Sequence, residues 1–326
     1  MLRARIVGTG SAVPDKVLTN FDLEKMVDTS DEWITTRTGI KERRIAVEGE
    51  YTSTFATRAA ERALEMAGIA AHEIDLLIVA TVTPDFPFPS TACIVQSNIG
   101  ASKAAAFDVS AACSGFVYGL SLASNAIRTG AASKVLVIGA EVLTRIIDWT
   151  DRNTCLLFGD GAGAAVLSSS SDEHGILSTH IHSDGNYWEL LYQAGCGSRN
   201  PAVQKTFDER LYFLRMQGNE VFKLAVRAME DAALEALTTN GLTPADIDIF
   251  IPHQANRRII DAIGKRLGLN GDKVFVNLDR YGNTSAASIP IALDEANRTG
   301  RIAAGDVVLF DSFGGGLTWG SALIRW

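Results

Sequence analysis

The sequence has few cysteines, and they follow no metal-binding or disulfide pattern. It contains four, with no Cys-X-X-Cys pair and no cluster of cysteine with histidine, namely Cys93, Cys113, Cys155 and Cys196. This wide spacing argues against a zinc site, so we expect no metal, and against a disulfide framework. Unpaired cysteines suit a reducing cytoplasm, where we expect the protein to act, and they leave a thiol available for chemistry.

The sequence also lacks an excess of positive charge. It has 30 Lys and Arg residues against 38 Asp and Glu residues, a formal net charge of −8. A nucleic-acid-binding protein needs a basic face, which this balance makes hard to build. We therefore expect no nucleic-acid partner.

No stretch has the character of a targeting or membrane segment. The apolar part of the N-terminal sequence MLRARIVGTGSAVP is too short for a secretory signal. The longest uncharged run, residues 109–127, approaches membrane-spanning length but contains four serines and Asn125. We expect a deeply buried helix there, and no membrane association.

The chain instead contains an internal repeat. Its 326 residues, 47% of them hydrophobic, are enough for two halves with a large core. Three pairs of segments match in the same order at offsets of 173, 170 and 172 residues: 66–83 with 239–256, 126–130 with 296–300, and 134–141 with 306–313. Each half then ends in a glycine-rich stretch that leads into an apolar strand, at 158–167 and 313–324.

This pattern predicts a duplicated α/β/α unit whose halves are related by a pseudo-twofold axis. Short apolar, β-branched runs alternate with helical patterns, as in layered α/β folds. We expect an N-terminal half of residues 1–171 and a C-terminal half of residues 172–326. Residues 174–217 have no counterpart of similar pattern, which suggests an insertion that covers part of the molecule.

The repeat brings polar residues to the centre of the predicted fold. At an offset of 170, Cys113 corresponds to Asn283, and each stands where a buried helix begins. A pseudo-twofold axis brings these two helix starts together. A thiol at a helix N-terminus is expected to have a lowered pKa, which favours the thiolate.

A histidine and a glycine-rich loop complete this candidate active site. His253 follows the apolar segment IDIFI, and open α/β sheets place ligands at strand ends. The backbone at Gly314, Gly315 and Gly316 can approach a ligand closely, as an oxyanion hole requires. Neither GTGSAV nor GDGAG fits a dinucleotide-binding fingerprint.

From end to end the sequence resembles the β-ketoacyl-acyl-carrier-protein synthase III family, condensing enzymes of the thiolase superfamily. The motifs that carry the resemblance are IVGTGSAVP, TSDEWITTRTGI, VSAACSGF, LFGDGAGAAVL, GNEVFK, HQANRR, YGNTSAASIP and GGGLTWGSAL. The resemblance implies a five-layered α-β-α-β-α, thiolase-like fold. It also implies an acyltransferase that starts type II fatty-acid synthesis without a metal or redox cofactor.

The resemblance assigns roles to the three central residues. Cys113 is expected to be acylated by an acyl-coenzyme A primer such as acetyl-CoA, with the N–H groups of Cys113 and Gly315 as oxyanion hole. His253 and Asn283 are expected to assist decarboxylation of malonyl-acyl carrier protein. The resulting carbanion then attacks the acylated cysteine, giving 3-oxoacyl-acyl carrier protein, coenzyme A and CO₂.

The resemblance also implies binding surfaces and a homodimer. Coenzyme A is expected to contact Thr29, Trp33, Arg37, Arg152 and Asn256. Phe88, expected to cross a dimer interface, and Leu143 would shape the primer pocket. Despite the net negative charge, an acidic carrier protein would meet a local basic rim, and its predicted contacts are Lys223, Gln254, Ala255, Asn256, Arg257 and Arg258, with Arg227, Lys265 and Arg266 nearby.

Two alternatives stay open at this point. A related condensing enzyme of secondary metabolism has the same Cys-His-Asn set. A Cys-His-Asn hydrolase would instead cleave thioesters or peptides with water. Formation of CO₂ and a longer acyl product from malonyl carrier protein distinguishes a condensing enzyme from the hydrolase.

Overall fold

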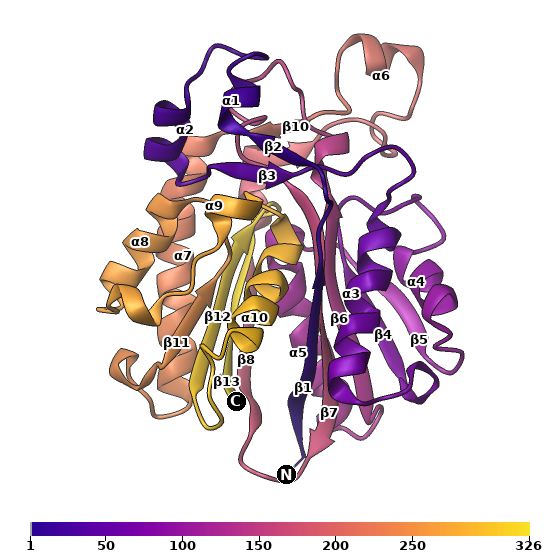
Figure 1. Ribbon diagram of the computed structural model, residues 1–326, viewed down its shortest axis with the longest axis vertical. Helices are drawn as coiled ribbons and strands as arrows, with labels where there is room; N and C mark the ends of the chain where they lie inside the picture. The colour runs from indigo at the N-terminus through magenta and orange to yellow at the C-terminus, as the bar shows by residue number, and fades with distance from the viewer. Residues whose placement is uncertain (1) are drawn as a thin grey trace.

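Two β-sheets with matching strand order form the frame of the molecule, which the computed structural model describes over residues 2–326 (Figure 1). Sheet 1 contains, in spatial order, β1 (Arg3–Ala12), β7 (Asp160–Ser170), β6 (Lys134–Val142), β4 (Leu76–Ala80) and β5 (Ala105–Val109). Sheet 2 contains β8 (Gly175–Ser183), β13 (Thr318–Arg325), β12 (Val307–Gly314) and β11 (Ile249–Pro252). The pairs β7–β6 and β13–β12 are antiparallel. The next strand in each sheet pairs in parallel, β4 with β6 and β11 with β12. The four strands of sheet 2 therefore correspond to β1, β7, β6 and β4 of sheet 1, as the repeat predicts, and β5 is an additional strand of sheet 1.

Helices form three layers around these sheets. The outer face of sheet 1 packs against α3 (Thr52–Ala67) and α4 (Thr91–Ile99). Between the sheets lie α5 (Gly115–Arg128) and α10 (Ser288–Arg298). The outer face of sheet 2 packs against α7 (Gly218–Thr239) and α8 (Arg257–Arg266). The predicted five-layered α-β-α-β-α fold is confirmed.

The apolar runs of the sequence are the elements that these layers enclose. Every residue of β6 after Lys134 is buried, because helices cover both faces of its sheet. The uncharged run 109–127 is the end of β5 followed by α5, whose inner residues pack between the sheets. Among residues 2–326, no helix combines the length and the hydropathy needed to cross a bilayer.

The segment between the two repeated units is only partly an insertion. The predicted boundary at residues 171 and 172 lies in the turn from β7 to β8. The expectation that all of residues 174–217 lack a counterpart is wrong, because β8 occupies in sheet 2 the place of β1 in sheet 1. The remaining residues form short elements, namely η4 (Gly185–Leu190), β9 (Leu191–Gln193), α6 (Gln204–Asp208) and β10 (Leu214–Met216).

These short elements lie at one end of the molecule, beside a segment of the first half that is outside the repeated unit. That segment contains β2 (Val17–Thr19), α1 (Asn20–Leu23), α2 (Asp31–Thr38) and β3 (Glu42–Arg44). Figure 1 shows both groups at the top of the view, above the two sheets. A small helix from the second half, α9 (Leu278–Tyr281), lies beneath β3.

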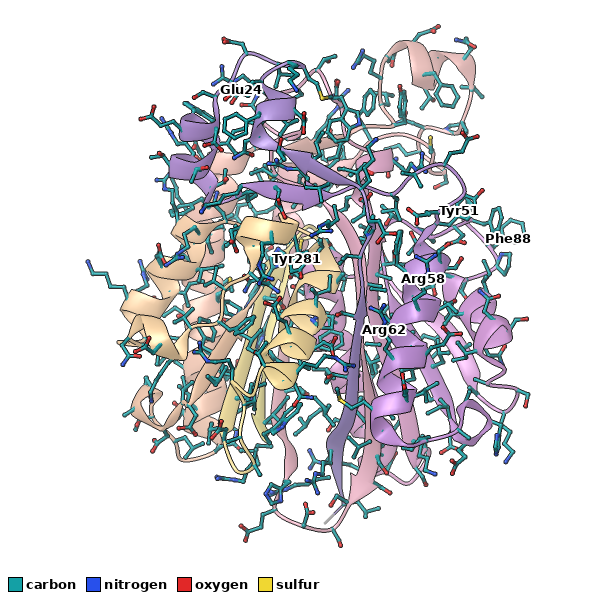
Figure 2. The ribbon with its side chains drawn as sticks, viewed as in Figure 1. Glu24, Tyr51, Arg58, Arg62, Phe88 and Tyr281 are labelled. Atoms are coloured by element: carbon teal, nitrogen blue, oxygen red, sulfur yellow. The ribbon has the colours of Figure 1, made fainter. Side chains whose placement is uncertain are left out.

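Sheet 1 has an uncovered apolar edge. Within the described chain, β5 pairs only with β4, so the outer edge of β5 has no strand partner. Phe107 on β5 is 39% exposed, and Phe88, in the loop before α4, is 86% exposed. Figure 2 shows Phe88 projecting outward on the side of the molecule that carries α4 and β5.

Candidate active site

The site forms where the two central helices begin. Before α5 the chain makes a short helix η2 (Ala112–Ser114), and before α10 it makes η7 (Ser285–Ala287). Each opens on a non-glycine residue with positive φ, 44° at Ala112 and 48° at Ser285. The two short helices contact each other, so the pseudo-twofold axis brings the helix starts together as predicted.

The register of the repeat differs from the prediction at this point. Because Ala112 and Ser285 correspond, the counterpart of Cys113 is Ala286, and the predicted match of Cys113 with Asn283 is wrong. The cause is a length difference, since α5 has 14 residues and α10 has 11. The offset is therefore 173 at the start of these helices and 170 at their end.

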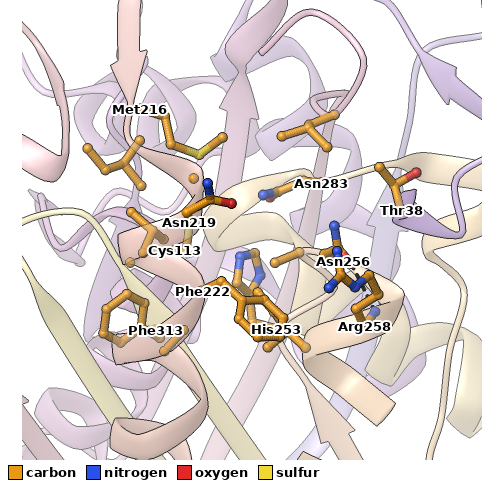
Figure 3. Close-up of a pocket in the computed structure, with 18 of the residues that line it drawn as sticks. Thr38, Cys113, Met216, Asn219, Phe222, His253, Asn256, Arg258, Asn283 and Phe313 are labelled. Carbon is orange, nitrogen blue, oxygen red and sulfur yellow. Dashed lines mark hydrogen bonds between the residues drawn. The ribbon is translucent and has the colours of Figure 1, made fainter. Parts of the chain in front are cut away.

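The structure nevertheless brings the three predicted residues together. Cys113, His253 and Asn283 line one cavity of about 620 Å³ (Figure 3). The cavity extends to Trp33 on α2 and Arg258 on α8. Side chains from both halves and from the insertion therefore enclose one space.

Cys113 lies at the inner end of this cavity and is 7% exposed. Gly314 approaches it so closely that a Cβ there would lie 2.6 Å from the Cys113 nitrogen, so the position requires glycine. Burial raises the pKa of the thiol to about 12, a Ser285 hydrogen bond lowers it, and the Glu141 charge raises it further. The expected lowering of this pKa is wrong for the resting site, because desolvation of the buried thiol is the largest influence on it.

His253 is held as a neutral imidazole. It follows β11, is 3% exposed, and its Nδ1 lies 2.7 Å from the Ser288 hydroxyl oxygen. Burial lowers its pKa to about 3, so the ring carries no charge at physiological pH. The same Ser288 oxygen accepts the Gln254 N–H at 3.2 Å, which fixes the hydroxyl under the ring.

Asn283 is oriented by its backbone and side chain together. Its Oδ1 accepts the Ser285 N–H at 2.9 Å, which leaves its NH₂ group as the free donor. Its own N–H donates to Leu157, and its carbonyl accepts from Gly159. The buried Arg43 guanidinium donates to the Leu156 carbonyl and so supports the same segment.

A second chamber, of about 280 Å³, lies on the far side of Cys113. Gly315 and Leu143 line it as predicted, together with Ser285. Within the described chain, no hydrogen bond is found for the Gly315 N–H. Phe88 does not line this chamber in its own chain and is instead exposed.

The predicted coenzyme A residues cluster around Trp33. The Arg152 guanidinium lies 4.8 Å and that of Arg37 5.4 Å from the centre of the indole ring. Asn256 caps α8 and donates to the Arg37 carbonyl at 3.3 Å. Trp33, Arg37 and Asn256 line the cavity, whereas Thr29 and Arg152 do not.

The predicted carrier-protein residues divide into three groups. Lys223, Ala255, Asn256 and Arg258 line the cavity toward its mouth. Arg257 is exposed outside the cavity, where it pairs with Asp261 at 2.7 Å. Gln254 is 1% exposed, so the prediction that it contacts a partner is wrong. Its side chain instead bonds the backbone of Pro252, Phe275 and Asn277.

Several groups at the site were not predicted. Asn219, at the start of α7, adds an amide to the cavity (Figure 3). Ser288 lies against the His253 ring, and Ser285 and the Glu141 carboxylate on β6 both influence the Cys113 thiol. Glu141 had a signal in the sequence, because it is a charged residue inside the apolar run KVLVIGAEV.

Comparison with known proteins agrees with this geometry. Two family models match, "3-Oxoacyl-[acyl-carrier-protein (ACP)] synthase III" at residues 107–185 and its C-terminal counterpart at residues 237–326. A beta-ketoacyl-[acyl-carrier-protein] synthase III of Caldanaerobacter subterraneus subsp. tengcongensis is 59% identical over 325 residues, covering 100% of this chain and 98% of the relative.

Solved structures give the same result. The crystal structure of 3-oxoacyl-[acyl-carrier-protein] synthase III from Aquifex aeolicus VF5 is 52% identical with a TM-score of 0.93, covering 99% of this chain and 100% of that one. The Thermus thermophilus enzyme is 50% identical with a TM-score of 0.92, covering 99% of both chains. With its three polar residues in one cavity, the chain belongs to the β-ketoacyl-acyl-carrier-protein synthase III family of condensing acyltransferases.

Proposed function

We propose that this chain condenses an acyl-CoA primer, acetyl-CoA in the first instance, with malonyl-acyl carrier protein. The observation that carries the proposal is the position of Cys113 between two chambers. The larger one opens past Trp33 and suits the coenzyme A arm, and the smaller one, beside Leu143, suits a short acyl group. Neither the proposed binding nor the proposed chemistry needs a metal or a redox cofactor.

In the first half-reaction, the Cys113 sulfur attacks the primer thioester. The N–H groups of Cys113 and Gly315 are proposed to hold the oxyanion, which agrees with the unpaired Gly315 N–H. Coenzyme A leaves through the larger chamber, and the acyl group stays on Cys113 with its chain in the smaller one.

In the second half-reaction, His253 and Asn283 are proposed to donate hydrogen bonds to the malonyl thioester oxygen as CO₂ is lost. Asn283 has its NH₂ group free because Ser285 occupies its oxygen. His253 donates from Nε2 when the Ser288 hydroxyl donates to Nδ1, an arrangement that its neutral state supports. The carbanion then attacks the acyl group on Cys113.

The proposal is tested by supplying acetyl-CoA and then malonyl carrier protein. Acetyl-CoA alone should acylate Cys113, located by peptide mass mapping, and the second substrate should release CO₂ and a 3-oxoacyl carrier protein. Acylation of Cys93, Cys155 or Cys196 would contradict the assigned nucleophile. Free acetate without a longer product would favour the hydrolase, which membership of the family already disfavours.

The carrier protein is proposed to dock on a basic surface at the cavity mouth. This surface consists of Lys223 on α7 and of Arg257 and Arg258 on α8. The Arg258 guanidinium lies 5.4 Å from the centre of the Phe222 ring, which holds it beside the opening. Lys223 is 69% exposed and forms an ion pair with Glu220 on the same helix. Positive charge here can attract an acidic partner despite the net charge of −8.

Reversing one of these charges should separate the two substrates. The Arg258→Glu variant should lose about tenfold or more in kcat/KM for malonyl carrier protein, because like charges repel at the docking surface. Its rate of acyl transfer from acetyl-CoA should change little. Steady-state kinetics at several salt concentrations measure both, with Arg301→Glu as control, because Arg301 is exposed after α10 and lines neither chamber. Equal loss with both substrates would mean that Arg258 does not select the carrier protein.

We also propose that two copies of the chain pair through β5. The free edge of this strand exposes backbone donors and acceptors that a second copy can satisfy by antiparallel pairing. Phe107 and Phe88 expose apolar surface on the same side. In such a dimer, Phe88 becomes buried at the interface, which supports its predicted place in the primer pocket of the partner.

A further inference from the structure

A buried acid lies directly behind the nucleophile. Glu141 on β6 is fully buried, and none of the salt bridges found in residues 2–326 includes it. Its carboxylate accepts hydrogen bonds from Thr83 Oγ1 at 2.5 Å, from Thr81 Oγ1 at 3.2 Å and from the N–H groups of Val82 and Thr83. Four neutral donors therefore hold an acid that no cation neutralises.

The backbone directs Glu141 toward the active site. Glu141 and Gly139 are two residues apart on β6 and so share a face of the strand. A Cβ at Gly139 would lie 2.1 Å from the Ala286 carbonyl oxygen, so this face lies against η7. Ser285, the neighbour of Ala286, is thereby placed next to the Glu141 carboxylate.

The Ser285 hydroxyl connects the acid with the thiol. It lowers the pKa of both Cys113 and Glu141 through side-chain hydrogen bonding. Yet its oxygen is buried and makes no hydrogen bond of regular geometry. Ser285 and Cys113 line the smaller chamber together, so the hydroxyl and the thiol face the same space.

The thiol needs such a neighbour. Because burial raises its pKa to about 12, the Cys113 thiol keeps its proton at physiological pH. His253 is a poor base for this proton because burial lowers its pKa to about 3. Burial raises the pKa of Glu141 to about 7, which makes its carboxylate a much better acceptor.

We propose that Ser285 and Glu141 form a proton relay that removes the Cys113 proton as the acyl group is transferred. The inference rests on the proposed function and deepens it, since it supplies the base for the first half-reaction. In this relay the Ser285 hydroxyl exchanges a proton with the thiol, and Glu141 acts through Ser285.

The step balances without any other reactant. The Cys113 S–H bond breaks as its proton passes to Ser285 Oγ, and the Ser285 hydroxyl proton passes to Glu141. The sulfur lone pair forms the bond to the acyl carbon, and the bond from that carbon to the coenzyme A sulfur breaks. The departing thiolate takes back one proton along the same path, which returns Glu141 to its ionised form.

The surroundings of Glu141 identify which group a pH measurement would report. The groups that face its carboxylate are Cys113 from η2, Ser285 from η7, and Thr81 and Thr83 from the segment after β4. Asp160, on the neighbouring β7, is instead bonded by Thr144 and Ala46.

The test measures the alkylation rate of Cys113 by iodoacetamide against pH, with peptide mapping to separate the exposed Cys93 and Cys196. Because the relay needs ionised Glu141, the wild-type rate should rise with pH and level off above about 7. In Glu141→Gln the rate at pH 8 should fall at least about tenfold, and the levelling near 7 should disappear.

The opposite result distinguishes a purely electrostatic role. The negative charge of Glu141 raises the pKa of Cys113. If Glu141 contributed only this charge, or only anchored the segment after β4, the Gln variant would react faster or at an unchanged rate. Either outcome overturns the proposal. Iodoacetamide requires no acyl-CoA, so a failed proposed function would show separately, as absent acetyl transfer in the wild type.

Two further variants serve as controls. Thr81→Val removes one donor to Glu141 without touching Ser285, and it should keep the levelling but move it to higher pH. The double variant Glu141→Gln/Ser285→Ala should be no slower than either single variant, because both interrupt one path. Additive losses in the double variant would overturn the relay. Thermal unfolding checks that each variant is folded.

Discussion

Replacing His253 by alanine should lower the rate of malonyl-carrier-protein decarboxylation by about a hundredfold or more, while acylation of Cys113 remains measurable. The reason is that negative charge develops on the malonyl thioester oxygen in a site closed to water. His253 is 3% exposed and Asn283 is 7% exposed, so water cannot easily replace a lost donor. Asn283→Ala should show the same selectivity with a smaller loss. Release of labelled CO₂ and mass spectrometry of Cys113 measure the two half-reactions separately.

The matched control is Cys113→Ala, which should have the reverse effect. Acylation stops because the nucleophile is gone, while some decarboxylation of malonyl carrier protein continues with His253 and Asn283 intact. If Asn283→Ala blocked acylation and spared decarboxylation, Asn283 would serve the nucleophile, and a hydrolase-like arrangement would explain the site better.

The Phe107→Glu variant should convert the proposed dimer into monomers. Pairing through β5 would bury this position, and a buried, unpaired carboxylate costs several kcal/mol, enough to weaken association by about a hundredfold or more. Sedimentation equilibrium at micromolar concentration should give twice the chain mass of 34.9 kDa for the wild type and the chain mass for the variant.

Leu234→Glu is the control for this experiment. Leu234 on α7 is also 39% exposed but lies in the layer outside sheet 2, away from β5. This variant should stay dimeric. A monomeric wild type, or equal dissociation of both variants, would show that the β5 edge is not the interface.

The duplicated fold was predictable because the repeated residues perform the same local tasks. Gly68 and Gly241 both stand just after the end of a helix, with positive φ of 63° and 67°. Asp75 stands before β4 and Asp248 before β11, and each accepts an N–H from the first residue of the neighbouring strand, Lys134 of β6 and Val307 of β12 respectively. Each of these structural roles depends on a short stretch of chain, so the repeat can be recognised from the sequence.

The details of the site depend on contacts that no short stretch encodes. The change of the repeat offset from 173 to 170 records the three residues missing from α10 but not where they are missing, so the register at Cys113 was misjudged although the cavity was placed correctly. The raised pKa of Cys113 results from burial under Gly314 and the insertion, and from Glu141 on another strand. The interior position of Gln254 likewise follows from the packing of β11 against residues 275–277.

The single larger chamber has a consequence for the order of events during turnover. The coenzyme A arm and the arm of the carrier protein must both reach Cys113 past Trp33 and Arg258, through the same space. The two substrates therefore cannot be bound together, and coenzyme A has to depart before malonyl carrier protein enters. Initial-rate plots should show the parallel lines of double-displacement kinetics, with free coenzyme A competing against the second substrate for the acylated enzyme.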